Sequence, residues 1–221
     1  MILTQPAIAE HLVLNDVSWE AYERLLEAFG DRRLRHSYDD GTLEIMSPLK
    51  RHDRAKKLIA RLIEMAAYEL DIEIQGIGST TLRRSERRKG LEPDECYYVA
   101  HEAEVRSEPD YVPERDPPPD LAIEVDVTSS SLDRMHIYAN LGVPEVWRFQ
   151  DGQLTFWRLG TGGRYLRCAR SRAFPQLTLA LLNGLLHQRF ERSENQIVRS
   201  LVTWLQEKAA RRRLKGKTPP G

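Results

Sequence analysis

Hydrophobic and polar residues alternate most clearly over residues 121–128, inside the segment from Pro117 to Trp147. The odd positions are apolar, and the even positions include the carboxylates of Glu124 and Asp126. Successive side chains of a strand point to opposite faces, so this pattern predicts a strand with both acids on one face. A turn, a helix and a second strand are expected to follow before Trp147. The same pattern also fits a half-solvated edge strand whose polar face meets water.

Helical spacing of apolar residues marks two segments in the first third of the chain. One stripe begins at Trp19, where Asp16 or Ser18 can cap the helix and Gly30 can end it. The other runs from Arg51 and is the strongest periodic signal in the sequence. We expect this longer helix to pack on a sheet.

Turn signals divide the other apolar runs into short strands. Asp40–Gly41 and Asp151–Gly152 predict two hairpins. Residues 83–90, with the sequence RRSERRKG, are expected to form a charged loop, and the acidic, proline-rich residues 100–119 a long surface loop. Further short strands are expected at 72–75, 80–84, 92–99 and 165–168.

Composition narrows the class of protein. The chain has 221 residues, which suits a single domain with a sizeable core. Lysine plus arginine and aspartate plus glutamate both number 33, so a nucleic-acid partner would have to meet a local basic patch. Cys96 and Cys168 lack metal-ligand spacing, and no apolar run resembles a signal peptide or a membrane span. We therefore expect a reduced, cytoplasmic protein without membrane association.

Several common kinds of active site have little support. The six histidines never occur at metal-ligand spacing, which argues against a zinc site. His52 stands at the start of the strongest helix, where it could face a site. A GxSxG nucleophile motif is absent, and Gly76 and Gly78 lack the third glycine of a dinucleotide-binding loop.

Carboxylates on several predicted strands point to a different chemistry. Glu44 lies in the first hairpin and Asp94 follows Pro93 at a strand start, whereas Glu124 and Asp126 lie on the alternating strand. Oxygen ligands of this kind suit Mg²⁺, which usually takes one or two carboxylates together with waters and phosphate oxygens. This set favours phosphodiester chemistry.

Two stretches together resemble a known family. They are LEPDECYYV and DLAIEVDVTSSSLDRMHIYANLGVPEVWRF, at residues 91–99 and 120–149, and they are similar to the PD-(D/E)XK restriction-endonuclease-like superfamily, specifically its Uma-type branch. The likeness covers roughly residues 15–185. It implies an α/β (mixed α+β) fold, with a mixed central sheet flanked by helices. It also implies that Asp94 and Glu124 hold a divalent metal, Mg²⁺ or Mn²⁺, for DNA cleavage.

The sequence departs from the family motif at one position. The lysine expected two residues after the second acid is Asp126 in this chain. Relatives often carry a basic residue on the following helix, and Arg134, four residues before Tyr138, stands there. An arginine can stabilise phosphate charge but is a poor proton acceptor. Alternatively, Arg134 is an ion-pair partner for Asp133, Glu124 or Asp126.

These residues predict a metal-dependent DNA endonuclease. Asp94 and Glu124 would hold the metal, Asp126 or Glu44 would add a ligand or position water, and Arg134 would stabilise the charge of the transition state. The alternative is a catalytically degenerate nuclease fold that binds nucleic acid or protein. A glycosidase with paired carboxylates is weaker, because no aromatic sugar platform is evident.

The C-terminal residues 191–221 lie beyond the expected nuclease domain of residues 1–190. An apolar stripe from Ile197 to Leu205 predicts an amphipathic helix, and a basic tail follows it. The stripe can fold back on the sheet or pair with a second copy, so we expect a homodimer as one possibility. The basic residues would then flank DNA, or else form a solvated tail.

Overall fold

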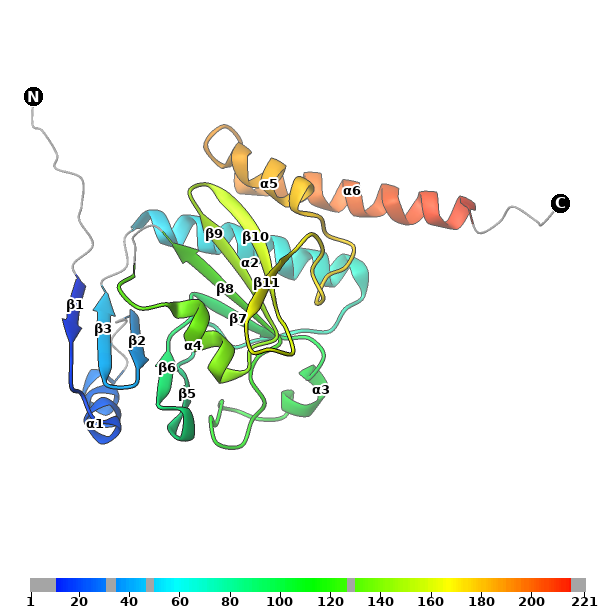
Figure 1. Cartoon of the computed structure of the whole chain (residues 1–221). Helices are drawn as coiled ribbons and strands as arrows, with labels where there is room; N and C mark the ends of the chain where they lie inside the picture. Colours follow the sequence, from blue (N-terminus) through cyan, green and yellow to red (C-terminus); the bar gives the residue numbers. More distant parts are fainter. Residues whose placement is uncertain (1–10, 31–34, 47–49, 127–129, 216–221) are drawn as a thin grey trace, which may run out of the picture.

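The computed structural model describes residues 11–30, 35–46, 50–126 and 130–215 (Figure 1). Its strands form two sheets. The antiparallel sheet has the order β1-β3-β2-β6-β5, with β1 (His11–Leu14), β2 (Arg35–Asp39), β3 (Thr42–Met46), β5 (Leu82–Arg84) and β6 (Lys89–Leu91). The mixed sheet has the order β11-β10-β9-β8-β7-β4, with β4 (Gln75–Gly76), β7 (Glu95–Tyr98), β8 (Leu121–Asp126), β9 (Glu145–Gln150), β10 (Gln153–Leu159) and β11 (Tyr165–Cys168).

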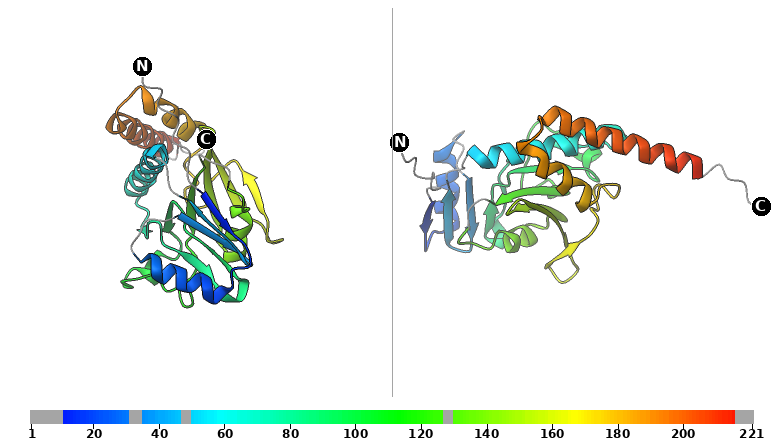
Figure 2. Two further views of the ribbon diagram at one scale, coloured as in Figure 1. Left: turned by 90° about the vertical axis from the view of Figure 1, so that its left-hand side faces the viewer. Right: turned by 90° about the horizontal axis from the view of Figure 1, so that it is seen from above.

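Helices cover both sheets. They are α1 (Trp19–Phe29), α2 (Lys50–Leu70), α3 (Glu102–Val105), α4 (Arg134–Leu141), α5 (Leu179–His187) and α6 (Glu194–Lys215), with the 3-10 turns η1 (Ser85–Arg87) and η2 (Gln188–Phe190). α2 and α6 pack together on one face of the mixed sheet (Figure 2). α4 contacts β2, β5 and β6 of the antiparallel sheet. The expected mixed α/β architecture is confirmed, with a second sheet beside the central one.

The alternating strand is β8, and it lies inside the mixed sheet. It pairs antiparallel with β7 and parallel with β9. Leu121, Ile123 and Val125 face the core under α2 and α6, whereas Ala122 and Glu124 face the side of α4. Both faces are buried, so the edge-strand interpretation is wrong.

The expected helix at Trp19 is confirmed as α1. Ser18 caps it by accepting a hydrogen bond from the backbone N–H of Ala21 at 3.2 Å, and Gly30 ends it with a positive φ of 52°. The helix buries Tyr22 against the antiparallel sheet, where its ring stacks on Tyr38 with 4.6 Å between centroids.

Both hairpins and the long helix from Arg51 are also confirmed. The sequence reasoning missed several elements, namely β1, β6, α3 and α5. β6 lies at the end of the segment expected to be a charged loop, and α3 lies inside the expected surface loop. α5 is apolar on most sides, so it lacks the polar face that marks an amphipathic helix. None of the helices in the described ranges is long and apolar enough to cross a membrane.

The apolar stripe of α6 folds back on its own chain. Ile197, Leu201 and Leu205 are buried in the same core as the α2 residues Leu58 and Leu62. This is the first of the two outcomes expected for the stripe, and it needs no second copy to cover these residues. α6 and the mixed sheet therefore share one hydrophobic core.

The end of α6 extends beyond the sheet (Figure 2). Two basic residues of this helix have partners in the chain itself. The Lys208 ammonium donates to the Gln176 carbonyl at 2.8 Å, and Arg211 forms an ion pair with Glu207 at 3.4 Å. The side chains of residues 212–221, which supply most of the basic tail, lie outside the described part of the chain.

Candidate active site at the junction of the two sheets

The candidate site forms where the chain passes from the antiparallel sheet to the mixed sheet. β6 ends at Leu91 and β7 begins at Glu95, so residues 92–94 connect the two sheets. β2 contributes Arg35 from the antiparallel sheet, β8 contributes Glu124 from the mixed sheet, and α4 lies against both. Tertiary packing thus brings four elements far apart in sequence to one place.

Glu124 is the centre of the site, and its carboxylate is almost fully buried, with 1% exposure. Arg134 donates to it twice, from Nε to Oε1 at 2.7 Å and from Nη2 to Oε2 at 3.0 Å. Tyr138 donates its hydroxyl proton to Oε2 at 2.7 Å, and Arg35 Nη2 donates to Oε1. Charged donors of this kind stabilise a buried carboxylate strongly.

Asp94 lies beside Glu124 and is held by the backbone of β8. Its Oδ2 accepts a hydrogen bond from the N–H of Val125 at 2.6 Å, and its own N–H donates to the carbonyl of Ile123 at 3.2 Å. Its side chain is 12% exposed. The backbone contacts with β8 therefore place the Asp94 carboxylate next to that of Glu124.

Arg35 bridges the two acids, and the sequence reasoning did not identify it. Its Nη2 lies 3.1 Å from Asp94 Oδ2 and also contacts Glu124 Oε1. Its Nη1 donates to the carbonyl of Val125 at 3.4 Å. Arg35 opens a predicted hairpin strand that is remote in sequence from both acids, so no local pattern indicated this role.

Arg134 is fixed on every side. Besides Glu124, its guanidinium donates to the Ser37 hydroxyl, to the carbonyl of Glu92 at 2.7 Å and to the carbonyl of His36 at 3.4 Å. The geometry shows an ion pair with Glu124, one of the partners expected from sequence. Asp133 has a different partner, because its side chain caps α4 by accepting from the N–H of His136 at 3.1 Å.

The two acids differ in pKa because their environments differ. Burial raises the pKa of Asp94 to about 6, partly offset by the charge of Arg35 and increased by that of Glu124. Burial also opposes the charge on Glu124, but Arg134 and Arg35 outweigh it and hold its pKa at about 2. Burial and the Glu124 charge raise the pKa of Tyr138 well above its ordinary value, so its hydroxyl remains a donor.

Glu44 has partners of its own. It is fully buried in β3, and it accepts hydrogen bonds from the Ser130 hydroxyl, the Ser131 N–H at 2.8 Å and the Ser131 hydroxyl at 2.9 Å. Burial raises the pKa of Glu44, but these serine hydrogen bonds outweigh it and lower the pKa overall. Glu44 pairs across the hairpin with Ser37, which contacts Arg134, so it lies one strand away from the ion-pair cluster.

Two other residues named from sequence lie at the boundary of the described structure. The backbone of Asp126 ends β8 and pairs with Gln150, but its side chain lies outside the described part. The side chain of His52, at the start of α2, also lies outside it. The expected roles of these two side chains stay predictions.

The donor chemistry at Asp94 and Glu124 suits a divalent metal. Mg²⁺ is commonly bound by one or two carboxylates together with waters, and these two carboxylates contact the same nitrogen of Arg35. That nitrogen occupies the position between the acids, so a metal there would replace it. Among the described residues, at this site or elsewhere, no group of three or more acid, histidine or cysteine side chains could hold a metal ion, so Asp94 and Glu124 would act as a pair.

Comparison with known proteins identifies a family and similar solved structures. Residues 19–189, more than half of the chain, match the family described as "Uma2: Putative restriction endonuclease". No curated protein matches the chain. A crystal structure described as "a putative nuclease belonging to DUF820" from Anabaena variabilis is 13% identical, with a TM-score of 0.49 over 68% of this chain and 90% of that chain. The family assignment rests on the sequence match.

Proposed function

The chain belongs to the Uma2 family of restriction-endonuclease-like proteins, and from this premise we propose that it is a Mg²⁺- or Mn²⁺-dependent DNA endonuclease. One observation carries the proposal. Two buried carboxylates from different elements, Asp94 and Glu124, lie close enough to contact the same guanidinium nitrogen of Arg35. Two carboxylates placed side by side in a protein interior repel each other unless one is protonated or a cation lies between them, and a divalent cation can take the place that Arg35 has here.

The residues around the acids have separate roles in this proposal. Asp94 and Glu124 hold the metal, which supplies Lewis-acid stabilisation of the phosphate and lowers the pKa of water. With a metal bound, Arg35 would leave its position between them and contact the phosphate, and the fixed Arg134 would add positive charge beside Glu124. Tyr138 and the backbone N–H of Val125 keep the two carboxylates oriented. Asp126 or Glu44 adds a ligand or positions water at the edge of the site.

Proton transfer needs a group other than the two arginines. Arginine is effectively always protonated, so neither Arg35 nor Arg134 can accept a proton from the attacking water. In this proposal, activity depends on the metal more strongly than in a relative that has the motif lysine at the position of Asp126.

Cleavage of supercoiled plasmid tests the proposal directly. Purified protein should nick the plasmid with Mg²⁺ or Mn²⁺ and should not with a chelator. Asp94→Asn and Glu124→Gln should abolish nicking. Glu145→Gln is the matched control, because Glu145 is another carboxylate with 1% exposure in the mixed sheet, bonded to Trp147 and to the backbone of Arg172. Nicking that survives both site variants would contradict the proposal.

A second function is favoured by the completeness of the ion-pair cluster. Two acids and two arginines neutralise each other without a metal, as in a fold that has lost catalysis and binds nucleic acid or protein. This alternative predicts DNA or protein binding with no nicking under any metal. It also predicts no rise in melting temperature on addition of Mg²⁺ or Mn²⁺.

We also keep a homodimer as a proposal. A twofold dimer would let an endonuclease reach both strands of a duplex. The interface cannot be the buried stripe of Ile197, Leu201 and Leu205, which the chain covers itself. Sedimentation of the full chain across a range of concentrations tests this; a monomer at all of them would contradict it.

A further inference from the structure

An exposed aromatic ring lies beside two arginines at one end of the mixed sheet. Phe190, the last residue of η2, is 71% exposed. The guanidinium carbon of Arg189 lies 4.4 Å from the centre of this ring, and that of Arg54 lies 5.3 Å from it. A single exposed ring is common on protein surfaces, but this one stands beside two cations and so offers a ligand both a stacking face and positive charge.

Both arginines are held in place by backbone carbonyls. Arg54 Nη2 donates to the carbonyl of Arg189 at 2.6 Å, and Arg189 Nη1 donates to the carbonyl of Leu186 at 2.9 Å. The Arg189 guanidinium also lies 5.4 Å from the ring centre of Phe149. These contacts order the side chains before any ligand binds, which reduces the entropy cost of binding.

The two cations lack a counter-charge among the residues that the structure describes. Neither guanidinium there forms an ion pair with a carboxylate, whereas the nearby Arg61 pairs with Glu194 at 2.7 Å. Burial and the charge of Arg54 lower the pKa of Arg189, as expected for two like charges close together. An anion bound to both would relieve this repulsion.

This surface lies at the same end of β8 as the candidate active site but on the other face of the mixed sheet, because Val125 faces α2 whereas Glu124 faces α4. Phe149 in β9 pairs with Val125 in β8, the residue directly after Glu124. The Arg189 guanidinium also reaches the β9–β10 turn, 4.0 Å from a Cβ built on Gly152. The start of α2, this turn and the segment between α5 and α6 gather at the same end of the molecule (Figure 1). A strand of nucleic acid would have to pass around this end of the sheet to reach both places.

We propose that Phe190, Arg54 and Arg189 form a binding site for single-stranded DNA, in which a base stacks on the ring and the arginines contact the adjacent phosphates. The proposal rests on the proposed nuclease function for the identity of the polymer. Every base offers a flat face that stacks on an aromatic ring, and a base can do so only where it is unstacked from its neighbours. The site therefore selects single-stranded or opened DNA rather than an intact duplex, with little sequence preference.

The experiment measures binding of short oligonucleotides in the presence of a chelator, so that no cleavage occurs. Three probes are used: a mixed-sequence single strand, the same strand with abasic positions, and the duplex. The parent should bind the single strand more tightly than the duplex. Phe190→Ala should weaken binding of the single strand by about tenfold and leave binding of the abasic strand unchanged. The double variant Arg54→Ala with Arg189→Ala should weaken binding of the single strand and of its abasic version. It should also reduce the dependence of the binding affinity on salt.

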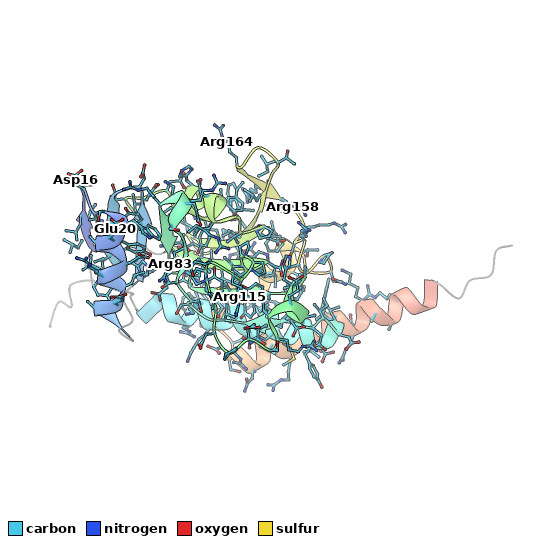
Figure 3. The ribbon with its side chains drawn as sticks, turned by 90° about the horizontal axis from the view of Figure 1, so that it is seen from below. Asp16, Glu20, Arg83, Arg115, Arg158 and Arg164 are labelled. Atoms are coloured by element: carbon cyan, nitrogen blue, oxygen red, sulfur yellow. The ribbon has the colours of Figure 1, made fainter. Side chains whose placement is uncertain are left out.

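Matched variants control for exposure and charge. Tyr68 is an aromatic residue with 79% exposure on α2, and it lines a hollow with Glu64, Glu69 and Asp71, so Tyr68→Ala should not change binding. Arg164 projects from the β10–β11 connection, at the opposite end of β10 from the Asp151–Gly152 turn (Figure 3). The double variant Arg164→Ala with Arg167→Ala removes the same charge there.

Two patterns of lost binding would overturn the proposal, as would unchanged single-strand binding by Phe190→Ala. One is equal loss of single-strand affinity in Phe190→Ala and Tyr68→Ala, and the other is loss in Phe190→Ala that is the same for the abasic strand. Plasmid nicking by the same preparations separates this inference from the proposed function. Phe190→Ala with normal single-strand binding and normal nicking contradicts the binding site alone, whereas chelator-resistant binding by a parent that never nicks contradicts the nuclease proposal alone.

Discussion

Arg134 and Glu124 form a buried, doubly hydrogen-bonded ion pair, with side-chain exposures of 5% and 1%. The arginine stands on α4, where the family resemblance placed the basic residue of the site, and the acid stands on β8. This pair ties the helix to the mixed sheet. Because the pair is buried between α4 and β8, a substitution of Arg134 changes the stability of the fold as well as any catalytic activity.

Arg134→Ala should therefore destabilise the protein by about 3 kcal/mol or more, since removing one partner of a buried ion pair typically costs about 3–5 kcal/mol. A residue that acts only on the phosphate would instead leave the free energy of unfolding unchanged when it is replaced. Arg134→Lys should cost less, because it keeps the charge but loses the double hydrogen bond. Urea unfolding measures both. Arg158→Ala, an exposed arginine on β10 (Figure 3), is the control and should change the free energy of unfolding by about 0.5 kcal/mol at most.

Asp94 should make stability depend on pH. Its pKa is about 6 in the folded protein and close to 3.8 when unfolded, so the folded state binds more protons between these values. The stabilisation from its protonated form is present below about pH 4 and is lost as the pH rises through about 6. Relative to Asp94→Asn, the parent should lose about 3 kcal/mol of unfolding free energy across this window. Unfolding is measured with a chelator present, and parallel pH profiles for the two proteins would contradict the assignment.

Arg35 should compete with a divalent metal for the two acids. Arg35→Ala should be less stable than the parent without metal, because Asp94 and Glu124 then repel each other. Millimolar Mg²⁺ or Mn²⁺ should raise its melting temperature more than it raises that of the parent. Adding Glu124→Gln to Arg35→Ala should remove most of the metal-dependent rise. An equal rise in all three proteins would show that the metal binds elsewhere.

Gly90 should be sensitive to the smallest substitution. A Cβ built at this position lies 2.3 Å from the Tyr22 hydroxyl oxygen, and that hydroxyl also contacts His36 Nε2 at 3.0 Å. Gly90→Ala should destabilise the protein by roughly 1–3 kcal/mol, the usual range for overpacking a buried site. Gly162→Ala is the control, because a Cβ there meets no atom within 4 Å. Thermal unfolding measures both, and similar losses would contradict the steric explanation.

Tyr22→Phe supplies the second half of this test. The variant removes the oxygen that a Cβ at Gly90 would meet, although ring atoms remain at 2.9 and 3.0 Å. Gly90→Ala should therefore cost less in a Tyr22→Phe background than in the parent. A double-mutant cycle gives the coupling free energy between the two positions. A coupling free energy near zero would mean that the clash lies with other atoms.

Local patterns in the sequence were sufficient to predict the helices and strands whose signals lie within a few residues of one another. Period-two alternation identified β8, helical spacing identified α1, α2 and α6, and turn residues identified the hairpins. These signals depend on backbone geometry, which each segment shows by itself. The two acids of the candidate site were named from the family resemblance of the stretches around Asp94 and Glu124.

Only the tertiary structure decided what surrounds the acids. Arg35 lies 89 residues before Glu124, and neither the charge nor the spacing of Arg35 distinguishes it from other arginines in the sequence. Its role arises because two sheets meet at residues 92–94, and because buried carboxylates need positive charge close by. The same packing buried the stripe of α6 against α2, and placed Phe190 beside Arg54, 136 residues earlier. Contacts between distant segments depend on which surfaces pack together, and a one-dimensional pattern does not contain that information.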